Sequence, residues 1–173
     1  MVLGMSLETF TLLHVVISLV GIASGFVVLF GLLNAKSFDR WTATFLVSTI
    51  LTSATGYLFP VHKLLPAHIV GAISLAVLVV AVLARYRFAL SGAWRAVYVV
   101  TAMLAFYLNF FVLIVQSFQK IPALHALAPT GTEGPFKIAQ LIALVIFGAL
   151  TIAAVRKFRP AAGVAGMASA ASR

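Results

Sequence analysis

The sequence predicts an all-α fold: a polytopic integral membrane protein built as a bundle of five transmembrane helices. Of its 173 residues, 63% are hydrophobic and only 9% are charged. A soluble domain is closer to half apolar and a quarter charged. Because a domain of this size has much surface for its volume, it cannot hide so many apolar side chains from water. The composition therefore excludes a soluble enzyme, a coiled coil, a disordered chain and a disulfide scaffold.

The apolar residues gather in five stretches that lack Asp, Glu, Lys and Arg. Each stretch is long enough to cross the hydrocarbon layer, about 30 Å thick, at about 1.5 Å per helical residue. The stretches are continuously apolar and lack the alternation of a barrel strand, so helices are the expected spanning form. The predicted spans cover about residues 9–33, 41–60, 66–84, 96–118 and 138–155.

The first span carries the most informative pattern. No Lys or Arg precedes Lys36, so the basic region of a signal peptide is missing and we expect this stretch to be retained. His14, Ser18, Gly21 and Gly25 share one narrow arc of the helical wheel. Gly21 and Gly25 form a GxxxG motif, which allows a second helix backbone to approach closely. His14 is therefore expected to point into the bundle.

The second and third spans are joined by a proline-bounded turn over Pro60–Pro66, which contains His62. Hydroxyl side chains in a helix can donate to carbonyls of the preceding turn, so a hydroxyl-rich span predicts tight packing more than a pore. The second span carries such side chains along one face at Thr44, Ser48, Thr52 and Thr55. His68 opens the third span and begins a stripe that is expected to face inward.

The fourth span has a polar face, on which Asn109 falls near mid-membrane. An amide at that depth is costly unless it is paired. This cost favours a helix–helix hydrogen bond, and the alternative is a polar lining for a quinone head, a haem edge or a small solute. The predicted lining consists of Asn109, Gln116, Gln119 and Gln140, the last at the start of the fifth span. The segment Lys120–Lys137 holds three prolines and two glycines, which predicts an irregular lid.

The basic residues predict the orientation. With five spans, nine of the twelve Lys and Arg residues fall on one side, and Lys63, Lys120 and Lys137 fall on the other. The side with more positive charge is expected in the cytoplasm. We therefore predict a multi-pass protein of the cell (inner) membrane with its N-terminus outside. Residues 1–159 form the transmembrane domain, and residues 160–173 form a flexible, low-complexity cytoplasmic tail.

All four histidines fall toward the outer face in this topology: His14, His62, His68 and His125. His14 and His68 are candidate cofactor ligands, because two facing imidazoles suit the iron of a b-type haem. The four histidines together could instead bind copper or zinc. A third interpretation makes His14 and His68 interfacial, or hydrogen-bonded to a neighbouring helix. The absence of Cys excludes covalent c-type haem and iron–sulfur clusters.

No charged residue lies in the clear interior of a span, and the chain has no Walker, GxSxG or HExxH motif. No catalytic residue is predicted, and we do not expect an enzyme. The first functional hypothesis is a small b-type haem or redox-associated membrane protein with a histidine site near the outer face. Its partners would be the lipid bilayer, a quinone or a membrane subunit. The alternatives are a non-catalytic subunit, assembly factor or scaffold, and a transporter of a small solute. The basic residues lie at span ends, so the net charge of +9 predicts no binding of nucleic acid.

Overall fold

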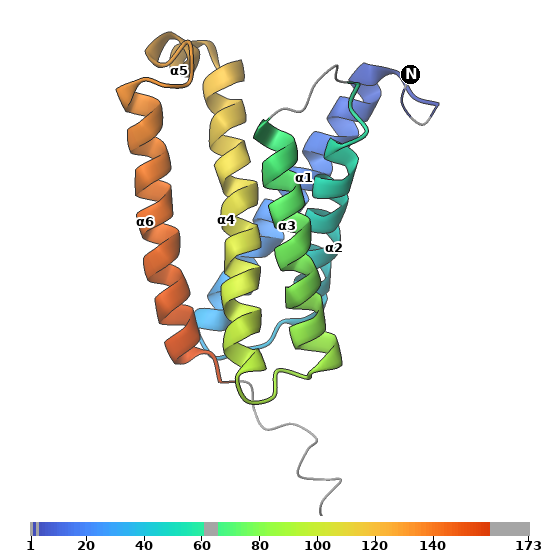
Figure 1. The fold of residues 1–173 in the computed structure, drawn as a ribbon, viewed down its shortest axis with the longest axis vertical. Helices are drawn as coiled ribbons and strands as arrows, with labels where there is room; N and C mark the ends of the chain where they lie inside the picture. The colour runs from blue at the N-terminus through green and yellow to red at the C-terminus, as the bar shows by residue number, and fades with distance from the viewer. Residues whose placement is uncertain (1, 3, 61–65, 160–173) are drawn as a thin grey trace, which may run out of the picture.

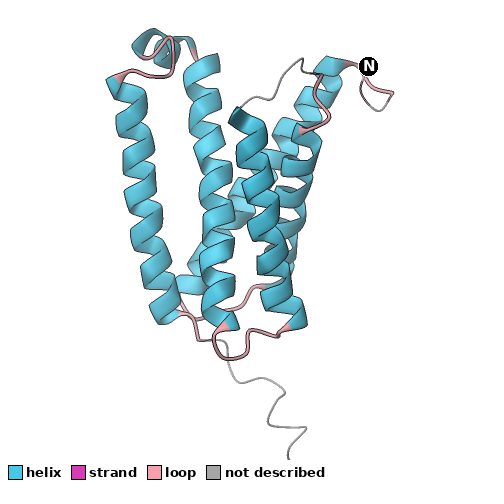
Figure 2. Cartoon of the chain, viewed as in Figure 1, coloured by secondary structure: helices cyan, strands magenta, loops and turns pink. Residues whose placement is uncertain are grey.

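The computed structural model describes residues 2, 4–60 and 66–159. Over these residues the regular elements are helices joined by loops (Figure 2), with an isolated bridge between Val2 and Met5, which confirms the all-α prediction. The predicted tail over 160–173 and the predicted site residue His62 lie outside the described residues. The elements in chain order are α1 (Leu7–Leu33), α2 (Asp39–Gly56), α3 (Pro66–Val82), the π-helical turn η1 (Leu83–Arg87), α4 (Trp94–Lys120), α5 (Pro122–Leu127) and α6 (Gly134–Lys157).

Four helices are long and apolar enough to cross a membrane, which indicates a multi-pass membrane protein. Their spans are Leu7–Leu33, Ala67–Arg87, Trp94–Lys120 and Gly134–Lys157. The structure differs from the prediction at the second span, because α2 is not among the candidate spans in the described part of the chain. Its 18 residues begin with Asp39 and Arg40 and include several hydroxyl side chains, and these polar groups lower its hydropathy.

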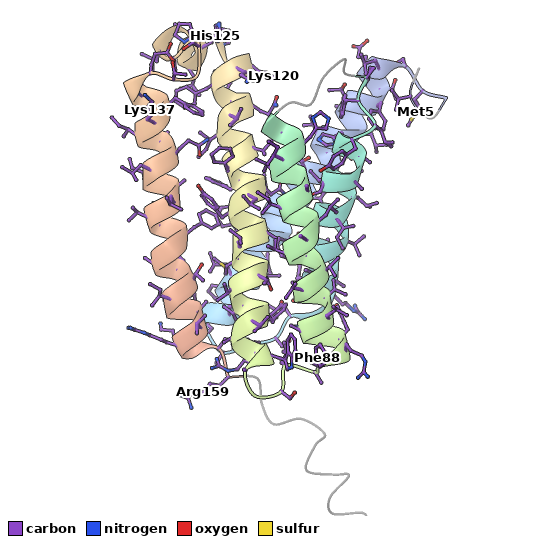
Figure 3. The ribbon with its side chains drawn as sticks, viewed as in Figure 1. Met5, Phe88, Lys120, His125, Lys137 and Arg159 are labelled. Carbon is purple, nitrogen blue, oxygen red and sulfur yellow. The ribbon has the colours of Figure 1, made fainter. Side chains whose placement is uncertain are left out.

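The long helices stand side by side and alternate in direction (Figure 1). α1, α3 and α6 run downward in this view, and α2 and α4 run upward. We call the end that holds the start of α1 the upper end, and the opposite end the lower end. In Figure 3, Lys120, His125 and Lys137 lie at the upper end, whereas Phe88 and Arg159 lie at the lower end.

The ends of the helices follow from local chemistry. Ser6 caps α1, because its side chain accepts a hydrogen bond from the amide of Thr9 at 3.1 Å. The sequence predicted an irregular lid between α4 and α6, but this segment contains the short helix α5. α5 begins at Pro122, and proline is well tolerated at the first position of a helix.

The packed core lies in the lower half of the bundle. Its centre is the ring of Phe106 on α4, which is 1% exposed. This ring contacts Phe26, Phe45 and Phe147, with centroids 5.0, 6.0 and 5.0 Å away. The fully buried side chains of the first, second and fourth helices also fall mostly in their lower halves. The upper half is packed less tightly and contains the site described next.

Candidate functional site

A cavity of about 610 Å³ lies in the upper half of the bundle, between α1, α2, α3 and α4. Most of the surface that faces the cavity is apolar, as is typical of sites for small ligands, and polar groups from all four helices lie between the apolar side chains. The polar lining residues are Thr11, His14, Ser18, Thr52, Ser53, Tyr57, His68, Ser74, Asn109, Gln116, Ser117 and Lys120.

Both candidate cofactor ligands line this cavity, His14 from α1 and His68 from α3. His125 lies on α5 at the upper end (Figure 3) and is not among the lining residues that the structure describes. Within the described ranges, no group of three or more His, Cys, Asp or Glu residues could hold a metal ion. Because His62 lies outside these ranges, the copper or zinc site that the sequence predicts from four histidines stays a prediction.

The hydrogen bonds of His14 favour one of its two neutral tautomers. Nδ1 lies 2.8 Å from the hydroxyl oxygen of Thr55 on α2. That hydroxyl also donates to the carbonyl of Leu51 at 2.6 Å, and a hydroxyl with its proton on Leu51 acts as an acceptor toward His14. This arrangement favours the proton on Nδ1 and the lone pair on Nε2. The Phe59 ring meets the imidazole edge-on, with centroids 5.2 Å apart.

His68 is held from its backbone side by Tyr57, which follows the end of α2. The Tyr57 hydroxyl donates to the carbonyl of His68 at 2.6 Å, and the two rings are tilted against each other at 5.4 Å. Gly71, one turn further along α3, leaves room for the same tyrosine, because a Cβ there would lie 3.3 Å from its ring. Sequence reasoning missed this role, since an aromatic residue near a span end is typical of the membrane interface.

Asn109 lies at the deep end of the cavity. Its side chain is only 8% exposed, and its Nδ2 has no hydrogen-bond partner in the described structure. It lies beside Gly21 of α1, where an added Cβ would be 3.0 Å from Nδ2. The hydroxyl of Thr52, which lines the same cavity, is also buried without a partner. An unpaired buried polar group costs about 1–3 kcal/mol, so the Asn109 amide is suited to a polar atom supplied by a ligand.

The structure separates the four residues of the predicted polar lining. Asn109 and Gln116 line the cavity, whereas Gln119 and Gln140 are not among its described lining residues. Gln140 instead donates from Nε2 to the carbonyl of Phe111 at 3.3 Å, which links α6 to α4. The helical wheel placed Gln116 and Gln119 about one turn apart on a shared face of α4, but it could not say where along that face the cavity ends.

The arrangement offers an uncharged acceptor at His14, an uncharged donor at Asn109 and apolar walls between them. Its described lining residues include Lys120 and no carboxylate. Comparisons with models of known protein families, with curated proteins and with solved structures found no match to this chain.

Proposed function

We propose that the protein binds a lipid-soluble redox molecule in the cavity between α1, α2, α3 and α4. The observation that carries the proposal is that His14 and His68, from different helices, line one largely apolar cavity. Its volume of about 610 Å³ falls within the range of about 300–1,000 Å³ usual for cofactor sites. A redox molecule is favoured because imidazole can accept a proton or ligate a metal near neutral pH.

A b-type haem is one ligand of this class. His14 would serve as an axial ligand through Nε2, since Thr55 favours the proton on Nδ1, and such outer hydrogen bonds orient metal-ligating histidines. His68 would be the second axial ligand. Lys120, which also lines the cavity and lies at the upper end (Figure 3), would pair with a haem propionate.

The visible spectrum of the protein purified in mild detergent tests this part of the proposal. Haem would give a Soret band and, after reduction with dithionite, sharp α and β bands. The bands should be lost in His14→Ala and in His68→Ala and kept in His125→Ala, since His125 lies outside the cavity lining. A preparation that holds neither haem nor any other lipid-soluble redox molecule would overturn the proposal in favour of a scaffold or subunit.

We also propose five membrane crossings, with the lower end in the cytoplasm and the protein in the inner membrane. α1 and α3 run in the same direction (Figure 1), which supports a crossing by α2 between them in the sequence. The hydroxyl-bearing residues of α2 are buried or half-buried, apart from Thr44. The charge pattern supports the orientation. Among the described Lys and Arg residues, only Lys120 and Lys137 belong to the upper end, while the lower end holds Lys36, Arg40, Arg85, Arg87, Arg95, Arg156, Lys157 and Arg159.

Thiol labelling tests this topology directly, because the chain has no cysteine of its own. Leu58→Cys and Thr132→Cys at the upper end should react with a membrane-impermeant maleimide in spheroplasts. Ser37→Cys and Ser91→Cys at the lower end should react only after the membrane is permeabilised. Labelling of residues 37 and 58 from the same side would show that α2 does not cross.

A further inference from the structure

We infer that the molecule bound in the cavity is a quinol, held between His14 at the upper level and Asn109 at the deep level. This inference rests on the proposed function, since it names the chemical class of the lipid-soluble ligand. It depends on two observations that are independent of each other: the hydrogen bonds that hold His14 through Nδ1 and the unpaired amide of Asn109.

The first argument is hydrogen-bond polarity. Nε2 of the neutral His14 ring is an acceptor in the tautomer that these hydrogen bonds favour, with the proton on Nδ1 toward Thr55. A phenolic hydroxyl of a quinol donates to such an acceptor. At the deep end, the second hydroxyl accepts from Nδ2 of Asn109, which lacks a partner in the described structure. A single ligand therefore supplies a partner both to Nε2 of His14 and to Nδ2 of Asn109.

The second argument is the spacing of the two levels. Asn109 lies beside Gly21, and His14 precedes Gly21 by seven residues on the same helix. Seven residues rise by about 10 Å along an α-helix. A six-membered ring with oxygen atoms at opposite positions, and a hydrogen bond of about 2.8 Å at each, spans a distance of this size.

The third argument separates a quinol from a haem. The only oxygen atoms of haem b are its propionate carboxylates, and burying those charges at the deep end would be costly. A haem with its propionates at the upper end would place hydrocarbon against Asn109 and leave Nδ2 unpaired. The quinol ring and the first unit of its tail instead contact apolar side chains between the two levels, which are supplied by Leu19, Val112 and Leu113.

The test is a titration of the purified full-length protein with short-chain ubiquinol and, separately, with the matching ubiquinone. We expect the quinol to bind more tightly than the quinone, because only the quinol can donate to Nε2 of His14. His14→Ala and Asn109→Leu should each weaken quinol binding about tenfold, the effect of one hydrogen bond to a buried group. Bound quinol should also raise the melting temperature of the wild type.

Gln140→Leu is the matched control. It removes a partly buried side-chain amide with an unpartnered atom, Oε1, but from α6 and outside the described cavity lining. It should leave quinol affinity unchanged. The melting temperature of unliganded Asn109→Leu should be no lower than that of the wild type, because the substitution removes a donor that has no partner. This result separates a loss of binding from a loss of folding.

The outcomes distinguish this inference from the proposed function. A purified protein that holds haem and does not bind quinol would overturn the inference and leave the proposed function standing. Equal quinol affinity in the wild type and Asn109→Leu, or equal affinity for quinol and quinone, would also overturn it. If the wild type holds no haem and binds neither quinol nor quinone, both proposals fail.

Discussion

Gly25 of α1 lies directly against the Phe106 ring of α4, so closely that a Cβ at position 25 would be 2.7 Å from the nearest ring carbon. Neighbouring aromatic rings hold the Phe106 ring in place, so it has little room to move aside. We therefore expect Gly25→Ala to lower the free energy of unfolding by about 1–3 kcal/mol, the usual cost of overpacking a core. Thermal unfolding in detergent measures the effect.

Gly148→Ala on α6 is the control for this prediction. No atom lies within 4 Å of the position of a Cβ there, and alanine favours a helix over glycine by about 1 kcal/mol. Stability should be unchanged or slightly raised. Equal destabilisation by both substitutions would show that close helix contact at Gly25 is not the cause.

Arg95 of α4 caps the C-terminal end of α6. Its guanidinium donates to the carbonyl of Val155 at 2.8 Å and to the carbonyl of Phe158, so it satisfies two groups that the helix leaves unpaired. We expect Arg95→Gln to destabilise the protein by roughly 1–3 kcal/mol, the range for hydrogen bonds to charged groups. Hydrogen exchange should speed up in the last turn of α6 before it does elsewhere. Lys157→Gln, an exposed substitution in the same turn, should leave exchange unchanged.

Arg85 of η1, the turn that follows α3, contacts the start of α2 at the lower end. It forms an ion pair with Asp39, donates to the Ser37 hydroxyl at 3.1 Å and lies over the Tyr98 ring at 5.3 Å. The Arg85 side chain is 8% exposed but that of Asp39 is 81% exposed. We expect Asp39→Asn to cost on the order of 1–2 kcal/mol, between the values for surface and buried pairs.

Arg85→Gln should cost at least as much as Asp39→Asn, because it also removes the contact with Tyr98. Arg40→Gln, an exposed substitution in the first turn of α2, is the control and should be nearly neutral. Urea titration in mild detergent would rank the three variants. A larger effect for Arg40→Gln would contradict the assignment.

Glu133 orders the turn that leads into α6. Hydrogen bonds, first from the backbone amide of Thr130 and then from its hydroxyl and the amide of Thr132, lower the pKa of the Glu133 carboxyl from 4.5 to about 2. A carboxyl whose pKa is lowered on folding stabilises the fold above its ordinary pKa, and this contribution is lost as the pH falls. We expect the turn to stay ordered at pH 4.5 and to lose this support as the pH falls to about 2.

The amide chemical shift of Thr130 reports this transition, with a midpoint near about 2. Glu133→Gln should abolish the titration. Thr130→Ala removes one donor and keeps both backbone donors, so it should raise the midpoint without restoring 4.5. A wild-type midpoint at 4.5 would show that these hydrogen bonds do not form in the membrane.

The sequence alone was enough to predict the class of the protein and the faces of its helices. Composition identified an all-α chain, and four of its predicted spans are long apolar helices in the structure. The GxxxG motif marked a close contact, and Gly21 and Gly25 do lie against α4. Hydroxyl groups of α2 do donate to the preceding turn, as at Ser48 and Thr55. These features depend on local periodicity and side-chain chemistry, which the sequence states directly.

Only the tertiary structure decided which groups meet across helices. The sequence left open whether His14 would be hydrogen-bonded to a neighbouring helix or available to a ligand. In the structure Nδ1 bonds to Thr55 of α2, whereas Nε2 is the nitrogen that we assign to a ligand. The sequence also favoured a helix–helix hydrogen bond for Asn109, yet Nδ2 has no partner in the described structure. A helical wheel gives the direction of a side chain but not the depth or identity of the residue opposite, which depend on how neighbouring helices are shifted along one another.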